Sequence, residues 1–146
     1  GCWEQYASDV ALVRAYRELS GVFEESVAIV NLARSGDAHA VAALRTNAEY
    51  LALGLVNVIA ALNPQAIIFG EPIASAWDLV ADIVVAELGK RVPPYCLKGL
   101  RLLPSRLGAD CALLGAAAFA LDHFFSRFDH TTGDSPPNRV AIRMYA

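Results

Sequence analysis

Apolar side chains recur along this chain at intervals that predict a mostly helical protein. In five segments they return every three or four positions, the spacing that places them on one face of an α-helix. Residues that favour helix starts precede these segments, and glycine or proline follows several of them. The pattern predicts helices over residues 9–19, 24–34, 38–62, 76–91 and 111–125.

Capping and helix-breaking residues mark the expected boundaries. Serine and aspartate side chains accept hydrogen bonds from the free amides of a first turn. They stand before four of the segments, as Ser8, Asp37, Ser75 and Asp110. Proline disfavours helical geometry in the residue before it, so Asn63-Pro64 is expected to end the third helix and Pro93-Pro94 the fourth.

The segment over residues 38–62 is the longest of the five. Its apolar stripe broadens toward the end until it covers nearly every side, so the second half is expected to be buried. A two-stranded sheet is too small to cover this surface, and large uncovered apolar patches mark interfaces. We therefore expect the chain to self-associate as a homodimer.

Two short segments have the composition of β-strands. Residues 66–69 form a β-favouring apolar run, and residues 100–103 form a second candidate. The tail over 129–146 is expected to be loose, with one candidate edge strand over 140–145. The fold class is therefore α/β, helix-rich, with about two strands. Two strands leave unpaired edges, so we expect further strands upstream and a chain cut from a longer polypeptide.

Composition excludes some functions for this chain. Of its 146 residues 55% are hydrophobic and 18% charged, with a formal net charge of -3. There is no broad basic surface to neutralise nucleic-acid phosphates, so any DNA binding by the parent protein must come from another region. Apolar runs are too short to span a bilayer, and no signal peptide precedes them, so a cytoplasmic location without membrane contact is expected. An odd number of cysteines, three, fits reduced thiols.

Several motifs, in order, resemble one family. The opening Gly-Cys-Trp-Glu-Gln-Tyr-Ala-Ser of residues 1–8 is similar to the end of the ROK-family signature, where Gly-Cys-x-Glu precedes a serine that starts a helix. Further similar segments follow at Ser35–Asp37, Leu62–Gln65, Ile67–Gly70 and Leu107–Asp110, the last leading into Leu114–Ala117. The resemblance covers about residues 1–125 and is nearer to the family's transcriptional repressors than to its kinases.

The resemblance implies an actin-like, ribonuclease-H-like fold of two lobes with a sugar bound between them. Residues 1–128 would form part of the second lobe, starting inside the zinc and sugar motif. Other sugar contacts would come from upstream Asn-Asp and Glu-x-Gly-His segments. Glu4 matches the glutamate that accepts hydrogen bonds from hydroxyls of a monosaccharide or amino sugar, a role that suits the several lone pairs of a carboxylate. The alternative is that Glu4 is a first-turn acid of the helix that begins near Ser8.

The resemblance also assigns a metal ligand. Cys2 matches the last cysteine of the family's structural zinc site, whose other ligands are a histidine and two cysteines upstream. Thiolates and imidazole in a closed tetrahedral set are typical of structural zinc. One thiolate is insufficient, so we expect zinc only in the full-length protein, with a site that is incomplete in this chain.

The segment after the first strand separates the family's kinases from its repressors. Kinases carry a run of glycines there, where bare backbone and free amides approach the nucleotide. Only Gly70 is retained here, and it would contact nucleotide only if the protein were a kinase. Glu71 adds negative charge and Pro72 removes an amide donor, so ATP binding is disfavoured. The repressors have a similar Gly-x-Pro-hydrophobic segment, although Glu71-Pro72 could simply start the helix near Ser75.

We therefore favour the sugar-sensing effector domain of a ROK-family repressor, with no catalytic residue in this chain. DNA would be bound through an N-terminal helix-turn-helix domain outside it. The alternative is the C-terminal lobe of an ATP-dependent sugar kinase similar to glucokinase. A third hypothesis is an oligomerisation module whose sugar site has decayed.

Overall fold

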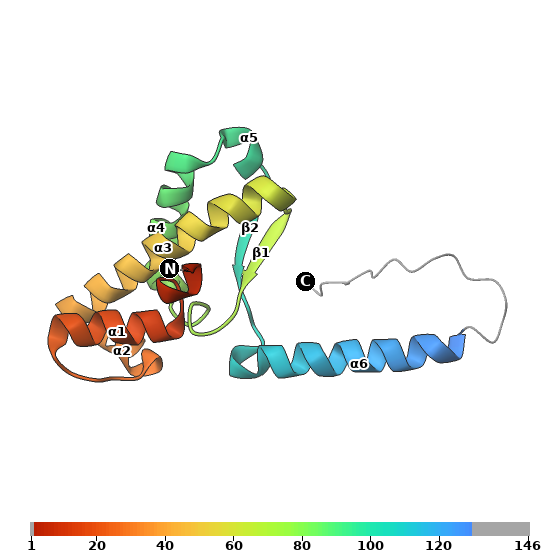
Figure 1. The fold of residues 1–146 in the computed structure, drawn as a ribbon, viewed down its shortest axis with the longest axis horizontal. Coiled ribbons are helices and arrows are strands. Elements are labelled where there is room, and N and C mark those ends of the chain that lie inside the picture. Colours follow the sequence, from red (N-terminus) through yellow and green to blue (C-terminus); the bar gives the residue numbers. More distant parts are fainter. Residues whose placement is uncertain (1, 130–146) are drawn as a thin grey trace. The chain divides into compact units, whose positions relative to one another are not determined.

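The computed structural model describes residues 2–129, apart from the side chains of residues 109 and 127–129. These residues divide into two units, one ending at Ala109 and the other beginning at Asp110. Figure 1 shows the helices and strands along the chain. Their bounds are η1 Trp3–Gln5, α1 Asp9–Ser20, α2 Ser26–Arg34, α3 Ala38–Leu62, β1 Ala66–Phe69, α4 Trp77–Arg91, α5 Pro94–Leu97, β2 Arg101–Pro104, η2 Gly108–Asp110 and α6 Cys111–Asp129.

The five predicted helices and the two predicted strands over 66–69 and 100–103 are all present. The longest helix and the first strand have the predicted bounds, and the other predicted helices and strand begin or end within a few residues of theirs. The short helix α5 and the two 3-10 turns were missed, because a single turn carries no periodicity to detect. The candidate strand over 140–145 and the tail beyond residue 129 lie outside the described residues. The predicted domain boundary at residue 128 stays a prediction.

Local capping explains why two of the helices start where they do. The Ser8 hydroxyl accepts a hydrogen bond from the Ala11 amide at 3.2 Å, and the Asp37 carboxylate accepts one from the Ala40 amide at 2.7 Å. Gly21 ends α1 in the left-handed region, with a φ of 75°. The predicted cap at Ser75 was wrong: α4 begins one residue later, after Ala76, and the Ser75 hydroxyl donates to the Pro72 carbonyl instead.

The 25-residue helix α3 is the centre of the first unit. Helices α1, α2 and α4 all pack against it (Figure 1). Its buried face is rich in alanine, which lets these neighbours approach closely; it consists of Ala40, Ala43, Leu44, Asn47, Ala48, Leu51, Ala52, Leu55 and Ile59. Helices α1, α2 and α4 cover this face, but Leu53 and Leu62 in the second half of α3 remain exposed. The expectation that the second half is buried was therefore wrong for these residues. The homodimer stays a prediction.

The two strands form a parallel pair beside this helical layer. Ala66 pairs with Arg101 and Phe69 with Pro104, and α4 and α5 lie in the connection between the strands, as a parallel crossover requires. The buried Phe69 ring stacks on Trp77 with centroids 4.6 Å apart, which fixes the end of β1 against the start of α4. The segment between them, residues 70–76, is held between two rigid elements.

The second unit is represented by α6, which has a largely apolar sequence. Two ring pairs lie along it, Phe119 with His123 and Phe124 with Phe125. Within residues 2–129 no helix combines the length and apolar character needed to cross a bilayer.

Candidate functional site

The opening segment of the chain folds into the single 3-10 turn η1, which carries Glu4. The Gln5 amide donates to the Cys2 carbonyl at 3.0 Å and the Tyr6 amide to the Trp3 carbonyl at 2.9 Å. A turn of this length has little stability of its own, because nucleating a turn fixes several residues for one or two hydrogen bonds. Its conformation must therefore depend on contacts with the rest of the fold.

Helices α1 and α3 supply those contacts. The Trp3 indole Nε1 donates to the Tyr50 carbonyl of α3 at 2.8 Å, and the Arg14 guanidinium of α1 donates to the Gln5 carbonyl. The Tyr6 ring lies 4.8 Å from the Tyr50 ring, centroid to centroid. The opening segment is thus fixed on both sides of Glu4.

A buried amide completes this anchorage. Asn47 of α3 is 3% exposed, and its Nδ2 donates to the Ser8 carbonyl at 3.0 Å and to the Tyr6 carbonyl at 3.4 Å. A buried polar side chain is tolerated only when it is hydrogen-bonded, and here both bonds go to backbone carbonyls of the opening segment. Asn47 therefore joins the end of the opening segment to the middle of α3.

The Glu4 carboxylate has no hydrogen-bond or ion-pair partner among residues 2–129, and the residue is exposed. Glu4 also lies outside α1, whose first-turn acid is Asp9. The alternative role in that first turn therefore belongs to Asp9. Glu4 is a carboxylate on an anchored backbone whose acceptor sites stay available.

An open groove of about 540 Å³ lies beside the opening segment, between η1, α1 and α3. Its walls combine aromatic, amide and charged side chains, from Gln5, Tyr6, Arg14, Glu18, Thr46, Asn47 and Tyr50 among others. Glu4 does not line it. The sugar contacts expected from upstream segments stay a prediction.

Cys2, the candidate zinc ligand, is an exposed free thiol next to η1. Within the described part of the chain no three His, Cys, Asp or Glu side chains cluster as metal ligands would. A structural zinc site needs four donors. Both the zinc ion of the full-length protein and the role of Cys2 as one of its ligands stay predictions.

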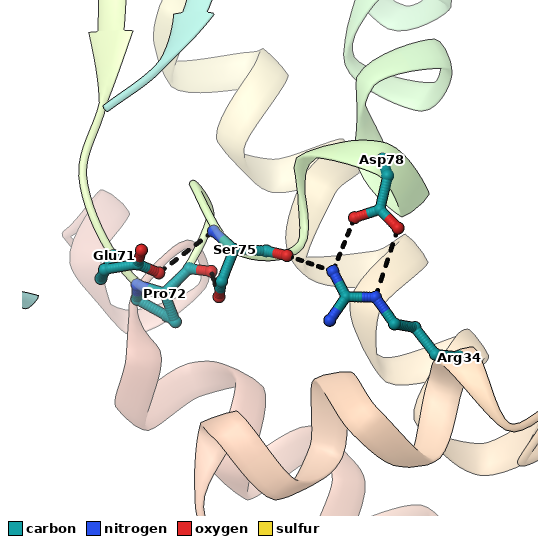
Figure 2. Close-up of polar contacts among 5 residues, drawn as sticks. All are labelled: Arg34, Glu71, Pro72, Ser75 and Asp78. Carbon is teal, nitrogen blue, oxygen red and sulfur yellow. Dashed lines mark hydrogen bonds and ion pairs between the residues drawn. The ribbon is translucent and has the colours of Figure 1, made fainter. Parts of the chain in front are cut away.

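Gly70, the candidate nucleotide contact, opens the loop over residues 70–76. Hydrogen bonds within this loop engage three successive amides. The Ala74 amide donates to the Gly70 carbonyl at 3.0 Å, the Ser75 amide to the Glu71 carboxylate at 3.1 Å and the Ala76 amide to the Ile73 carbonyl at 3.1 Å. Figure 2 shows the Glu71 side chain folded back over the loop toward Ser75. Glu71 therefore serves as an internal acceptor of the loop.

An arginine from a distant helix holds the end of this loop. Figure 2 shows the Arg34 guanidinium of α2 between the Ser75 carbonyl and the Asp78 carboxylate. Its distances to the two Asp78 oxygens are 2.8 and 3.3 Å, a bidentate arrangement. The hydrogen bond from Arg34 is the main cause that lowers the pKa of Asp78 below its ordinary value of 3.8. Sequence inspection missed Arg34, since 44 residues separate the pair and no local spacing signals it.

Replacing Arg34 with glutamine is expected to return the pKa of Asp78 toward 3.8, because its main hydrogen-bond donor is removed. A carboxyl group whose pKa is lower in the folded than in the unfolded state stabilises the fold at pH values above its unfolded-state pKa. This stabilisation is lost as the pH falls through the folded-state pKa. Wild type and variant should therefore differ in stability near neutral pH and converge in acid. NMR titration of the Asp78 carboxyl tests this.

The internal reference for that titration is Glu87. Lys90 first and then Arg91 lower the pKa of Glu87 by hydrogen bonds within α4, so Arg34→Gln should leave it unchanged. An Asp78 pKa that does not rise in the variant would contradict the role given to Arg34.

The fold places the protein in a structural class. The ROK family glucokinase from Streptomyces griseus, solved with glucose and AMPPNP, superposes with a TM-score of 0.72 and 28% identity, covering 82% of this chain and 44% of that one. A ROK family transcriptional regulator, a homolog of the Escherichia coli Mlc protein, superposes with a TM-score of 0.66 and 26% identity over 73% of this chain and 30% of that one. The chain has the helix-rich architecture of part of an actin-like ATPase fold.

The sequence assigns the family within that class. The family model described as ROK family matches residues 1–123, and the chain belongs to the ROK family. The xylose repressor of Bacillus spizizenii is 34% identical over 126 residues, which make up 85% of this chain and 32% of the repressor. The chain therefore spans about a third of the length of that relative.

Proposed function

We propose that this chain is part of the sugar-sensing effector domain of a ROK-family transcriptional repressor. The observation that carries this proposal is the internally hydrogen-bonded loop after β1, since this loop occupies the place where a kinase of the family needs free amides. The similarity to the xylose repressor supports the same choice.

The loop opposes nucleotide binding through both hydrogen bonding and charge. Phosphate groups bind well to loops whose backbone amides point freely at the ligand. Here the amides of Ala74, Ser75 and Ala76 donate within the loop, and Pro72 has none to offer. A phosphate near Ser75 would have to displace the Glu71 carboxylate and would then meet its negative charge.

Glu4 supports sugar binding on physical grounds. A sugar presents adjacent hydroxyl donors, and a carboxylate accepts several hydrogen bonds at once. The anchored backbone on either side of Glu4 reduces the conformational entropy lost when its side chain binds a ligand. The ligand class is a monosaccharide or amino sugar, which Glu4 would bind together with residues outside this chain.

The full-length protein would respond to its sugar by a change of conformation. Sugar bound between two lobes would favour one angle between them, and that angle would set the position of an N-terminal helix-turn-helix domain relative to its dimer mate. We further propose a structural zinc ion with Cys2 as one ligand, a homodimer and a cytoplasmic location for that protein.

One observation favours the alternative, an ATP-dependent sugar kinase. The Streptomyces griseus glucokinase superposes with a TM-score of 0.72, and Gly70 directly follows β1 in this chain. In that case, Gly70 would be the residue of this chain in contact with the nucleotide.

Two experiments on the full-length protein test the proposal. The first is calorimetric titration with pentoses, hexoses and N-acetylhexosamines, and the second is a phosphotransfer assay with Mg²⁺ and ATP. We expect binding of at least one sugar and no ATP-dependent phosphorylation of it. Phosphorylation of the bound sugar would establish the kinase alternative. No binding of any sugar would favour the decayed oligomerisation module.

A further inference from the structure

Gly54, in the middle of α3, lies where another part of the chain touches bare helix backbone. A Cβ atom built on it would stand 2.0 Å from Cε2 of the Trp3 indole and 2.4 Å from two further ring atoms. Carbon atoms in proteins do not approach so closely, so the indole occupies the space that any side chain at residue 54 would need. By contrast, Gly89 in α4 has no such neighbour within 4 Å.

A hydrogen bond fixes the orientation of the same indole. Its Nε1 donates to the Tyr50 carbonyl at 2.8 Å. Residues 50 and 54 lie one helical turn apart on the same face of α3, and a carbonyl oxygen has a second lone pair for a donor outside the helix. We call this surface, made of the Gly54 backbone and the Tyr50 carbonyl, the indole seat.

The contact is poorly explained as core packing. Trp3 remains 44% exposed, so a large part of the usual gain from burying a tryptophan is not realised. Glycine in a helix interior is also less stable than alanine by about 0.5–1 kcal/mol. The glycine in α3 and the half-exposed Trp3 ring therefore add little to the stability of the fold. A role of the ring in positioning neighbouring residues explains the contact better.

We infer that the indole seat positions Glu4 for the sugar, which makes Trp3 and Gly54 positioning residues of the proposed site. Glu4 directly follows Trp3 in η1, whose other side is held at Gln5 by Arg14. Without the seat the N-terminal side of the turn loses its attachment to α3, and the Glu4 carboxylate loses its fixed place. The inference rests on the proposed function, because it concerns the same sugar.

The test uses the full-length protein and three variants: Gly54→Ala, Glu4→Gln and the two combined. Calorimetry with the preferred sugar measures affinity, and fluorine NMR of fluorotryptophan-labelled protein follows the Trp3 signal, which is assigned by its loss in Trp3→Phe. Gly54→Ala should shift the Trp3 signal and weaken sugar binding about tenfold or more, approaching the loss of a hydrogen bond to a charged group. Gly89→Ala, the matched control, should change the affinity less than about twofold.

The combined variant shows whether the seat acts through Glu4. If it does, Gly54→Ala should cause little further loss in the Glu4→Gln background, because the losses of coupled residues do not add. Hydrogen exchange of the α3 amides verifies that this helix stays folded. If Gly54→Ala unfolds, Trp3→Phe serves in its place. It removes the indole donor and reduces the ring, keeps Gly54, and should also weaken sugar binding.

Three results distinguish a failure of the positioning role, of the route through Glu4 and of the proposed function. An unchanged affinity in Gly54→Ala despite a shifted Trp3 signal overturns the positioning role. Fully additive losses in the combined variant overturn the route through Glu4. A wild-type protein that binds no sugar overturns the proposed function and this inference with it.

Discussion

Replacing Glu4 with glutamine in the full-length protein is expected to weaken sugar binding by roughly ten- to a hundredfold. Glutamine keeps the size of the side chain but replaces one acceptor oxygen with a donor group, so a sugar hydroxyl loses its charged acceptor. Hydrogen bonds to charged groups are worth about 1.5–3 kcal/mol, which gives this range of affinity. Because Glu4 has no partner among residues 2–129, the fold should stay nearly unchanged.

The matched control is Glu25→Gln. Glu25 is an exposed glutamate before α2, and its side chain makes no capping hydrogen bond. The same chemical change there should leave sugar affinity unaltered. Calorimetric titration of both variants decides the role of Glu4, and equal affinity in wild type and Glu4→Gln would remove Glu4 from the site.

Truncation of Leu55 to alanine is expected to destabilise the α3 region by about 2–5 kcal/mol. Leu55 is 4% exposed in the packed face of α3, so its loss removes buried apolar contacts and leaves a cavity. Leu53, two residues earlier in the same helix, is 41% exposed. Leu53→Ala should therefore cost less than about 1 kcal/mol.

Hydrogen exchange of the α3 amides in the full-length protein measures both changes, because it reports the free energy of opening for that helix alone. Similar losses in the two variants would contradict the arrangement in which α1, α2 and α4 bury one face of α3.

The sequence predicted the elements of this fold well where local chemistry decides them. The bounds of α3 were predicted correctly because Asp37 caps its start and Asn63-Pro64 breaks its end, two signals that need no tertiary context. Residues 66–69 were recognised as a strand from β-branched and aromatic composition. Ser75 misled because a serine hydroxyl can donate as well as accept, and in the fold it donates to the Pro72 carbonyl.

The contacts that build the candidate site were beyond sequence reasoning, because they join residues far apart in the chain. Trp3 and Tyr50 are 47 residues apart, and Arg34 and Asp78 are 44 apart. Nothing in the local sequence around Gly54 signals that the Trp3 indole contacts it. Nor does the pattern of one helix reveal which neighbours pack against it, which is why the burial of the second half of α3 was predicted only in part.

The hydrogen bonding of the loop over residues 70–76 has an evolutionary consequence. Substitution of Glu71 would release the Ser75 amide, but the Ala74 and Ala76 amides would still donate to loop carbonyls, and Pro72 would still lack one. No single substitution would therefore release the amides of Ala74, Ser75 and Ala76 together. Under the proposed function, evolution of this loop toward nucleotide binding would therefore require several substitutions, each of which releases a different amide.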